Sequence, residues 1–138
     1  MRAHLSKAFG IAQQTQELVN PDMVTLLGFH EATLIAFAQV KRQAPPAGIH
    51  IDAPVELHRF YVDRTAHGKG VAQQLMRAVH TAAREFGGQA LWLGVWERNP
   101  RAIAFYQKVG FVDCGSHDFF VAQDRQTDRV LVAPVQAG

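Results

Sequence analysis

The stretch VELHRFYVDRTAHGKGVAQQLM, residues 55–76, joins a strand pattern to an amphipathic helix pattern through a loop with two glycines. Gly68 and Gly70 can take backbone angles that other residues resist. At a helix start, such a loop leaves several N–H groups without partners, and together with the helix dipole they form a site for an anion. The stretch therefore predicts a phosphate-binding loop between a strand and a helix, although a tight turn that binds nothing has the same composition.

The composition indicates one globular domain that covers residues 1–138. The hydrophobic fraction of 48% and the charged fraction of 19% suit a packed core. The net charge of +2 is too small to indicate nucleic-acid binding. No apolar run reaches the roughly 18 residues that a membrane span needs. The single cysteine, Cys114, allows no internal disulfide and fits a reducing compartment. We therefore expect a cytoplasmic protein without a nucleic-acid or membrane partner.

Upstream of the glycine loop, the patterns predict a helix, a hairpin and a strand. Residues 5–19 carry apolar groups at a loose helical spacing. Two short apolar runs flank the compact HEA at 30–32, as in a β-hairpin. Strand alternation over 55–62 puts Glu56 and Phe60 on one face.

Downstream of the loop, a helix carries a regular apolar stripe from Val71 to Phe86, and His80 lies outside this stripe. The segment ALWLGVW at 90–96 is almost entirely apolar, as in a strand that is buried on both faces. Asn99 and Pro100 are typical of a helix start.

Two last strands, near 111–122 and 129–135, flank the polar turn QDRQTD. The whole order predicts a mixed α/β sheet with helices on both faces.

A second stretch, WERNPRAIAFYQKVGF at 96–111, indicates a family. An apolar strand ends at polar Asn99, a short helix carries Tyr106 two turns later, and a Gly-Phe pair closes it. Together with residues 55–76, this stretch resembles the GNAT superfamily of acyl-CoA-dependent N-acyltransferases, over roughly residues 22–135. The resemblance implies an α/β fold with a mixed, mostly antiparallel central sheet flanked by helices. It also implies an N-acetyltransferase with acetyl-CoA as its cosubstrate.

The C-terminal part, which runs through GSHDFFVAQDRQTDRVLV, is similar to bacterial Pai-type spermidine/spermine acetyltransferases. This similarity implies a small-molecule amine as acceptor, with polyamines as one candidate. A peptide or protein N-acetyltransferase and a non-catalytic CoA-binding sensor are the alternatives.

The resemblance also implies a cofactor site around the glycine loop. The N–H groups of residues 68–73 would hold the CoA pyrophosphate, and the strand end at 60–62 would pair with the pantetheine arm. Asn99 would hydrogen-bond the same arm. His67 stands where the family has Gln or Arg, in a position that offers chiefly its backbone. The expected cofactor-binding residues are Phe60, Tyr61, Val62, His67, Gly68, Lys69, Gly70, Val71, Ala72, Gln73, Asn99 and Tyr106.

The resemblance implies two catalytic residues, Tyr106 and Glu56, and the chemistry of acetyl transfer agrees with these roles. An alkyl amine with a pKa of about 10.4 must lose a proton before it attacks a thioester, and a carboxylate can accept that proton. Glu56 is the first candidate for this base, with Glu97 and His58 as alternatives. Tyr106 can donate to the leaving sulfur, or it is simply a core aromatic residue.

Two further expectations concern the N-terminus and metals. Relatives usually begin with a strand, whereas here the predicted helix follows Met1 almost at once, so the first strand is expected to be missing. Either part of the N-terminus is missing from the sequence, or another chain, such as a second copy in a homodimer, covers the exposed sheet edge. The seven histidines show no paired spacing, so no metal site is predicted.

Overall fold

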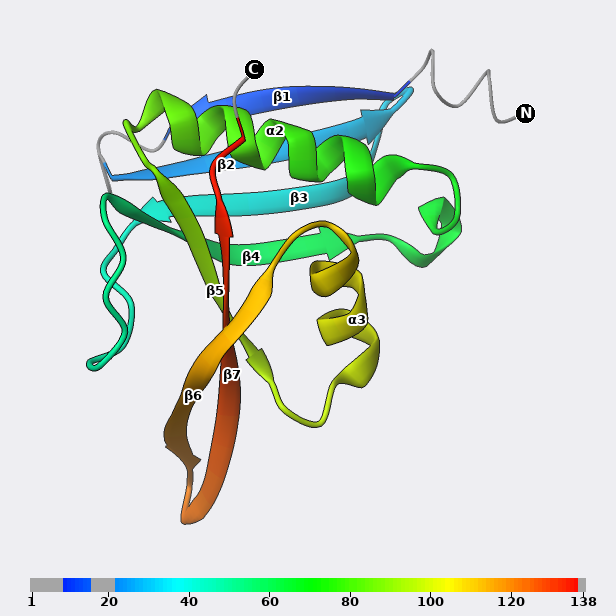
Figure 1. The fold of residues 1–138 in the computed structure, drawn as a ribbon. Helices are drawn as coiled ribbons and strands as arrows, with labels where there is room; N and C mark the ends of the chain where they lie inside the picture. Colours follow the sequence, from blue (N-terminus) through cyan, green and yellow to red (C-terminus); the bar gives the residue numbers. More distant parts are fainter. Residues whose placement is uncertain (1–8, 16–21, 137–138) are drawn as a thin grey trace.

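The computed structural model describes residues 9–15 and 22–136. One seven-stranded sheet, in the order β1-β2-β3-β4-β5-β7-β6, carries two α-helices (Figure 1). Neighbouring strands are antiparallel except for β4 and β5, which confirms the mixed, mostly antiparallel sheet. The elements are β1 Phe9–Thr15, β2 Met23–His30, β3 Thr33–Arg42, β4 Pro54–Val62, the 3₁₀ turn Arg64–Ala66, α2 Val71–Glu85, β5 Ala90–Trp96, α3 Pro100–Lys108, β6 Val112–Val121 and β7 Asp124–Pro134.

The N-terminal strand β1 stands where the sequence predicted a helix over 5–19. It pairs antiparallel with β2, with Phe9 opposite His30 and Thr15 opposite Val24. The helix prediction is therefore wrong over 9–15, and the rest of the predicted helix lies outside the described residues. The free edge of β2 presents N–H and C=O groups that need partners, and this demand outweighs a loose helical spacing. Strand β1 thus covers the edge of β2, which was expected to be exposed.

A bulge in β4 decides which of its side chains share a face. The register between β3 and β4 shifts by one residue, which leaves His58 without a cross-strand partner. Leu57, before the bulge, and Phe60, after it, consequently both pack into the core. The prediction that Glu56 and Phe60 share a face is wrong, because one inserted residue inverts the alternation of the strand.

The parallel strands β4 and β5 stay together only at their beginnings. Pairing covers Pro54–Glu56 and Ala90–Trp92, and beyond these residues the two strands diverge (Figure 1). The sheet therefore has an opening near its centre. Helices α2 and α3 both lie on the face toward which Phe60 points, on either side of a cleft, whereas the sequence predicted helices on both faces.

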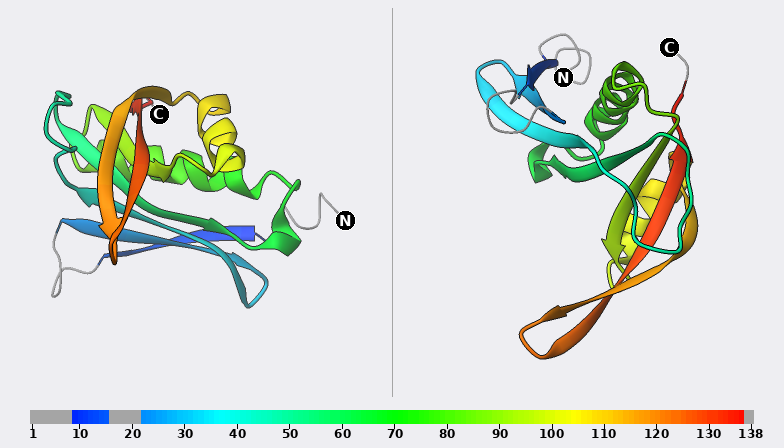
Figure 2. Two further views of the ribbon diagram at one scale, coloured as in Figure 1. Left: turned by 90° about the horizontal axis from the view of Figure 1, so that it is seen from below. Right: turned by 90° about the vertical axis from the view of Figure 1, so that its left-hand side faces the viewer.

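Strands β6 and β7 form a hairpin arm that extends beyond the body of the sheet (Figures 1 and 2). The predicted polar turn QDRQTD is wrong from Asp124 onward, because β7 already begins there. The turn itself is tighter and contains Ala122 with a φ of 56°. Polar residues suit this strand because cross-strand contacts satisfy them, as when the Thr127 hydroxyl donates to Asp118 Oδ1 at 2.8 Å.

The remaining element predictions are confirmed. The hairpin around residues 30–32, the helix after the glycine loop and the apolar strand at 90–96 all form. Asn99 caps α3, since its Oδ1 accepts from Ala102 N–H at 3.2 Å, and Pro100 occupies the first turn. None of the helices in the described part of the chain is both long and apolar enough to cross a membrane.

His80 of α2 differs from its prediction because it is buried rather than on the outer face, with 3% of its surface exposed. The segment after β7 lies across the helix at this point. There Gln136 N–H donates to His80 Nδ1 at 3.1 Å, and Arg84 Nη1 donates to Gln136 O at 2.6 Å. Burial lowers the pKa of His80. The helix periodicity could not show this contact, because its partner is 56 residues away.

Leu75 lies at the centre of the core that α2 forms with the sheet and is 0% exposed, whereas Leu34 on β3 is 49% exposed. We expect Leu75→Ala to lower the free energy of unfolding by about 2–5 kcal/mol, because it removes buried methyl groups and leaves a cavity. The same substitution at Leu34 serves as the control and should cost less than about 1 kcal/mol. Urea unfolding followed by circular dichroism measures both, and equal losses would contradict this assignment of the core.

Candidate active site

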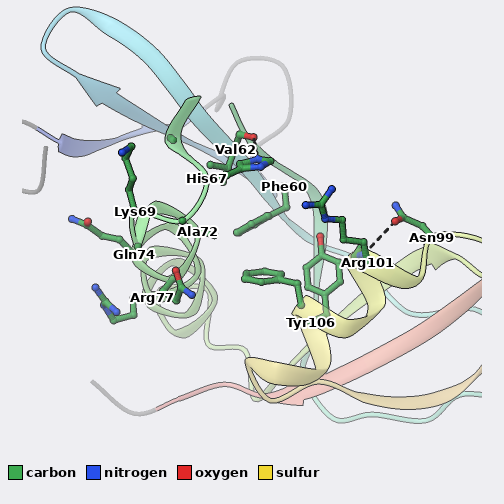
Figure 3. A pocket seen from close by; sticks show the side chains of 16 residues that line it. Phe60, Val62, His67, Lys69, Ala72, Gln74, Arg77, Asn99, Arg101 and Tyr106 are labelled. Carbon is green, nitrogen blue, oxygen red and sulfur yellow. Dashed lines mark hydrogen bonds between the residues drawn. The ribbon is translucent and has the colours of Figure 1, made fainter. Parts of the chain in front are cut away.

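A cleft of about 820 Å³, here called the main cleft, lies between the start of α2 and α3, over the later part of β4 (Figure 3). It brings together most of the residues that the sequence predicted to bind a cofactor. These are Phe60, Val62, His67, Gly68, Lys69, Gly70, Ala72, Gln73, Asn99 and Tyr106.

Two predicted cofactor-binding residues, Tyr61 and Val71, do not line the main cleft. The Tyr61 ring lies against Phe37 with centroids 5.6 Å apart, and its hydroxyl donates to Asp63 Oδ1 at 3.2 Å. Val71 is 2% exposed and belongs to the core. Their side chains point away from the cleft, so any contact of theirs with a ligand is limited to the backbone.

The start of α2 presents unpaired N–H groups to the main cleft. Gly70 caps the helix in a left-handed conformation with a φ of 80°, and no side chain caps it. The first helical bond runs from Gln74 N to Gly70 O at 3.1 Å, so the N–H groups of residues 71–73 have no acceptor within the helix. A Cβ added at Gly68 or Gly70 would meet nothing within 4 Å, so the space above the loop is open. With no acidic residue in the first turn, this end of the helix is suited to an anion.

His67 fastens the glycine loop to the end of β4. Its Nε2 lies 2.9 Å from Val62 O and therefore carries the proton of this hydrogen bond. Asp63 N–H donates to Ile35 O of β3 at 2.7 Å. Because backbone groups alternate along a strand, those of Phe60 and Val62 face the opposite edge, where β5 has diverged. His67 occupies one of these groups, and the others remain for a ligand.

Tyr106 of α3 lies in an aromatic cluster at the wall of the main cleft. Its ring centroid is 6.1 Å from that of Phe60, 5.4 Å from Phe105 and 5.7 Å from Phe111. Burial among these rings raises the pKa of Tyr106 to about 12, so the phenol keeps its proton at neutral pH. The hydroxyl points into the cleft (Figure 3), where it can donate a hydrogen bond.

A second hollow of about 480 Å³, here called the rear pocket, lies on the opposite face of the sheet. Glu56 lines it instead of the main cleft, because this residue precedes the bulge and points away from the core side of β4. Its Oε2 is 3.5 Å from His58 Nδ1. Of the two alternative bases, His58 lines the rear pocket and Glu97 lines neither hollow. The residues that line the rear pocket are Gln43, Ala44, Pro45, Pro46, Glu56, Leu57, His58, Trp92, Gly94, His117, Asp128 and Val130.

Strand β5 forms the floor of the rear pocket. Trp92 Nε1 donates to Gln43 O at 2.8 Å and so holds the loop that walls the pocket. A Cβ at Gly94 would lie 3.0 Å from Asp128 Oδ2, so the Asp128 carboxylate occupies the space above this glycine. Burial raises the pKa of Asp128, and nearby His117 opposes the rise.

A comparison with protein-family models shows to which family the chain belongs. The model described as the acetyltransferase (GNAT) family matches residues 3–111. The chain belongs to this family. It is therefore an acyltransferase, as the sequence predicted.

Two relatives and one solved structure illustrate the kinship. The chain is 31% identical over 121 residues to an uncharacterized N-acetyltransferase of Mycobacterium tuberculosis. This alignment covers 88% of this chain and 73% of that protein. It is 28% identical over 92 residues to the spermine/spermidine N(1)-acetyltransferase of Bacillus subtilis. This second alignment covers 66% of this chain and 60% of that protein. The PaiA N-acetyltransferase of Thermoplasma acidophilum, solved with coenzyme A, matches with a TM-score of 0.65 at 22% identity, over 86% of this chain and 65% of that one.

These matches confirm the family and the resemblance to Pai-type enzymes. The chain spans less than two thirds of the Bacillus and Thermoplasma proteins. Their substrates are therefore not established for this protein.

The sequence reasoning missed several residues of both hollows. Arg77 and Gln74 of α2 and Arg101 of α3 line the main cleft. A signal for Arg77 was available, because it lies one helical turn after Gln73 and so shares its face. Asp128 of the rear pocket was expected to be a solvated acid of the polar turn, because the last strand was predicted to begin later; the observed register pairs it with His117. Within the described residues, no group of three His, Cys, Asp or Glu side chains could hold a metal ion.

The N–H groups at the start of α2 can be tested with coenzyme A itself. We expect coenzyme A to raise the Tm of the wild-type protein and Gly70→Asp to abolish this shift. The new side chain adds bulk and negative charge where the pyrophosphate would bind, while a carboxylate at a helix start does not itself destabilise the helix. Gly48→Asp is the matched control, since Gly48 also has a positive φ, of 92°, and lies outside the cleft. An undiminished shift in Gly70→Asp would remove the loop from the binding site.

Proposed function

We propose that this protein transfers the acetyl group of acetyl-CoA to a primary amine by direct attack within a ternary complex. The observation that carries the proposal is the position of the two hollows. The main cleft borders β4 at Phe60 and Val62, and the rear pocket borders the same strand at Glu56 and His58, on the other face. Both adjoin the opening where β4 and β5 diverge, so two ligands could meet there.

The features of the main cleft fit coenzyme A. The N–H groups at the start of α2 would hold the pyrophosphate, and Lys69 and Arg77 in the lining add positive charge. The free backbone groups of Phe60 and Val62 would pair with the amide groups of the pantetheine arm, as an added strand does. The Asn99 Oδ1 is occupied by the helix cap, which leaves its amide NH₂ to donate to the same arm. When bound, acetyl-CoA supplies the activated acyl group as a thioester.

The role proposed for Tyr106 is a hydrogen bond to the leaving sulfur. A thiol titrates near 8.5, whereas burial raises the pKa of Tyr106 to about 12. Full transfer of the phenolic proton to a thiolate would therefore be uphill. Hydrogen-bond donation needs no such transfer and still stabilises the developing negative charge on sulfur.

The role proposed for Glu56 is removal of a proton from the acceptor amine. The amine nitrogen attacks the thioester carbon, a C–N bond forms, and the C–S bond breaks to release coenzyme A. The proton from nitrogen passes to the Glu56 carboxylate, directly or through water. His58, 3.5 Å from this carboxylate, would then pass the proton on to solvent.

The acceptor class we propose is a small-molecule amine, with polyamines as the first candidate. The likeness to the spermine/spermidine N(1)-acetyltransferase of Bacillus subtilis supports this choice. The pair of carboxylates in the rear pocket, on Glu56 and Asp128, also suits a cation.

We also expect a cytoplasmic location and a homodimer. The dimer is supported by β6, the outer strand of the sheet, because its edge is open in the described structure. This strand also exposes large apolar side chains, among them Val112 at 63% and Phe120 at 67%.

Turnover with a panel of acceptors tests the proposed reaction. Acetyl-CoA is incubated with polyamines, simple amines, amino acids and lysine-containing peptides, and free thiol and acetylated product are measured. Thiol release with the small amines is the expected result. Release only with peptides would favour a protein acetyltransferase. Binding of acetyl-CoA without turnover of any acceptor would favour a sensor.

Tyr106→Phe keeps the ring and its packing but removes the hydroxyl. We expect kcat to fall about 10- to 100-fold, the size of a lost hydrogen bond to a charged group, with little change in the KM for acetyl-CoA. Tyr61→Phe is the control, since Tyr61 does not line the main cleft, and it should keep full activity. Steady-state kinetics with one good amine measures both, and an unimpaired Tyr106→Phe enzyme would leave Tyr106 as a core residue only.

Glu56→Gln keeps the shape of the side chain but removes its basicity. At pH 7 we expect kcat/KM to fall by about 10²- to 10⁴-fold, the range for a lost general base. The loss should shrink at high pH, where free amine is plentiful because alkyl amines titrate near 10.4. Glu97→Gln is the matched control. Parallel pH profiles for wild type and Glu56→Gln would instead make Glu56 an orienting residue and transfer the base role to His58 or Glu97.

A further inference from the structure

Asp128 of β7 is a partly buried carboxylate that takes no part in the proposed chemical steps. It lines the rear pocket, and its side chain extends over Gly94, where a Cβ would lie 3.0 Å from Oδ2. Among the described residues the Asp128 carboxylate makes no hydrogen bond or ion pair, and its electrostatic neighbour is His117. Burial raises the pKa of Asp128, as is usual for a carboxyl that has lost water without gaining a strong partner. A cation beside it would favour the charged form and reverse this rise.

The other acids of the hairpin arm are placed differently. Asp113 accepts two hydrogen bonds of 2.8 Å from the Arg129 guanidinium. Asp118 accepts from Thr127 at 2.8 Å and lies 3.9 Å from Arg125. Both have partners within the arm, and neither lines the rear pocket. Asp128 therefore differs from these two acids because it lines a pocket, and its cross-strand neighbour there is His117 and not an arginine.

The two hollows have opposite charge. The main cleft is lined by Lys69, Arg77 and Arg101 and, in the part of the chain that the structure describes, by no acidic residue. The rear pocket is lined by Glu56 and Asp128 and, among the described residues, by no lysine or arginine. Two histidines, His58 and His117, also line it. Such complementarity selects ligands by charge, an anion on one face of the sheet and a cation on the other.

The two carboxylates of the rear pocket stand apart from each other. Glu56 lies opposite Trp92 of β5, while Asp128 reaches over Gly94, two residues further along the same strand. One strand spacing and two residues along a strand separate the Glu56 backbone from the space above Gly94 by on the order of 8 Å. The two carboxylates therefore come from separate positions, and each can face its own ammonium group. Apolar residues, including Trp92 and Val130, line the pocket as well and would suit a methylene chain.

We infer that Asp128 is a specificity-determining residue, which holds a second positive charge of the acceptor while Glu56 faces the amine that is acetylated. This inference rests on the proposed function and narrows it to diamines and longer polyamines. Gly94 contributes to the same cation site, because a glycine without a side chain leaves the space that the Asp128 carboxylate occupies.

Matched acceptors test this inference. Pentylamine and 1,5-diaminopentane have the same chain length and differ in the second amine. We expect the wild-type enzyme to prefer the diamine in kcat/KM, and Asp128→Asn to reduce that preference by about tenfold, while the rate with pentylamine stays nearly unchanged. Asp124→Asn is the control, since Asp124 is exposed at the hairpin turn and outside the pocket. It should behave as wild type.

Gly94→Ala provides a second variant that keeps the charge. The new Cβ would crowd Asp128 Oδ2, so the carboxylate must shift. We expect the preference for the diamine to fall in this variant as well, by a smaller factor than in Asp128→Asn. A preference that is unchanged in both variants overturns the inference.

Calorimetric titration with 1,5-diaminopentane, without acetyl-CoA, separates this inference from the proposed reaction. We expect Asp128→Asn to raise the Kd about tenfold and Asp124→Asn to leave it unchanged. If no amine is acetylated but this difference in Kd remains, the proposed reaction fails and the cation site stands. If amines are acetylated and Asp128→Asn changes neither the Kd nor the preference, the cation site fails and the proposed reaction stands.

Discussion

The early separation of β4 from β5 is the constraint on which the rest of the site depends. Parallel neighbours usually continue together, yet here pairing ends after Pro54–Glu56 and Ala90–Trp92. The later part of β4 therefore carries backbone donors and acceptors with no strand beside them, and such groups need partners. His67 supplies one partner by bonding to Val62 O, which also fixes the glycine loop at the mouth of the main cleft. The remaining groups are available to an extended, amide-containing ligand.

The bulge in β4 gives this opening two chemically different sides. The extra residue at His58 keeps Phe60 on the core side, where its ring lies 5.8 Å from that of Phe105. Glu56, before the bulge, points to the other face. The sheet thus separates a cleft with basic side chains from a pocket with carboxylates. An anionic acyl donor and a cationic acceptor would each be attracted to its own face and would meet only at the opening.

The C-terminal hairpin and the segment after it contact both the rear pocket and helix α2. Strand β7 contributes Asp128 to the rear pocket, and the segment that follows it lies across α2. There the buried His80 and Arg84 both bond to the backbone of Gln136. The helix whose first turn faces the main cleft is therefore fastened at its other end by the same part of the chain that shapes the rear pocket.

The sequence by itself determined what depends on near neighbours in the chain. Three local features are the positive φ that Gly70 allows, the Asn99 cap and the apolar run of β5. Most residues of the main cleft and the family could be predicted from the sequence around them. Only the tertiary structure decided β1, the two faces of β4 and the place of Asp128. A strand forms at 9–15 because the edge of β2 needs hydrogen-bond partners. The bulge at His58 reverses which side chains of β4 face the core, because pairing with β3 fixes the register of β4. Register and edge pairing depend on contacts between residues far apart in the chain, and no local pattern encodes them.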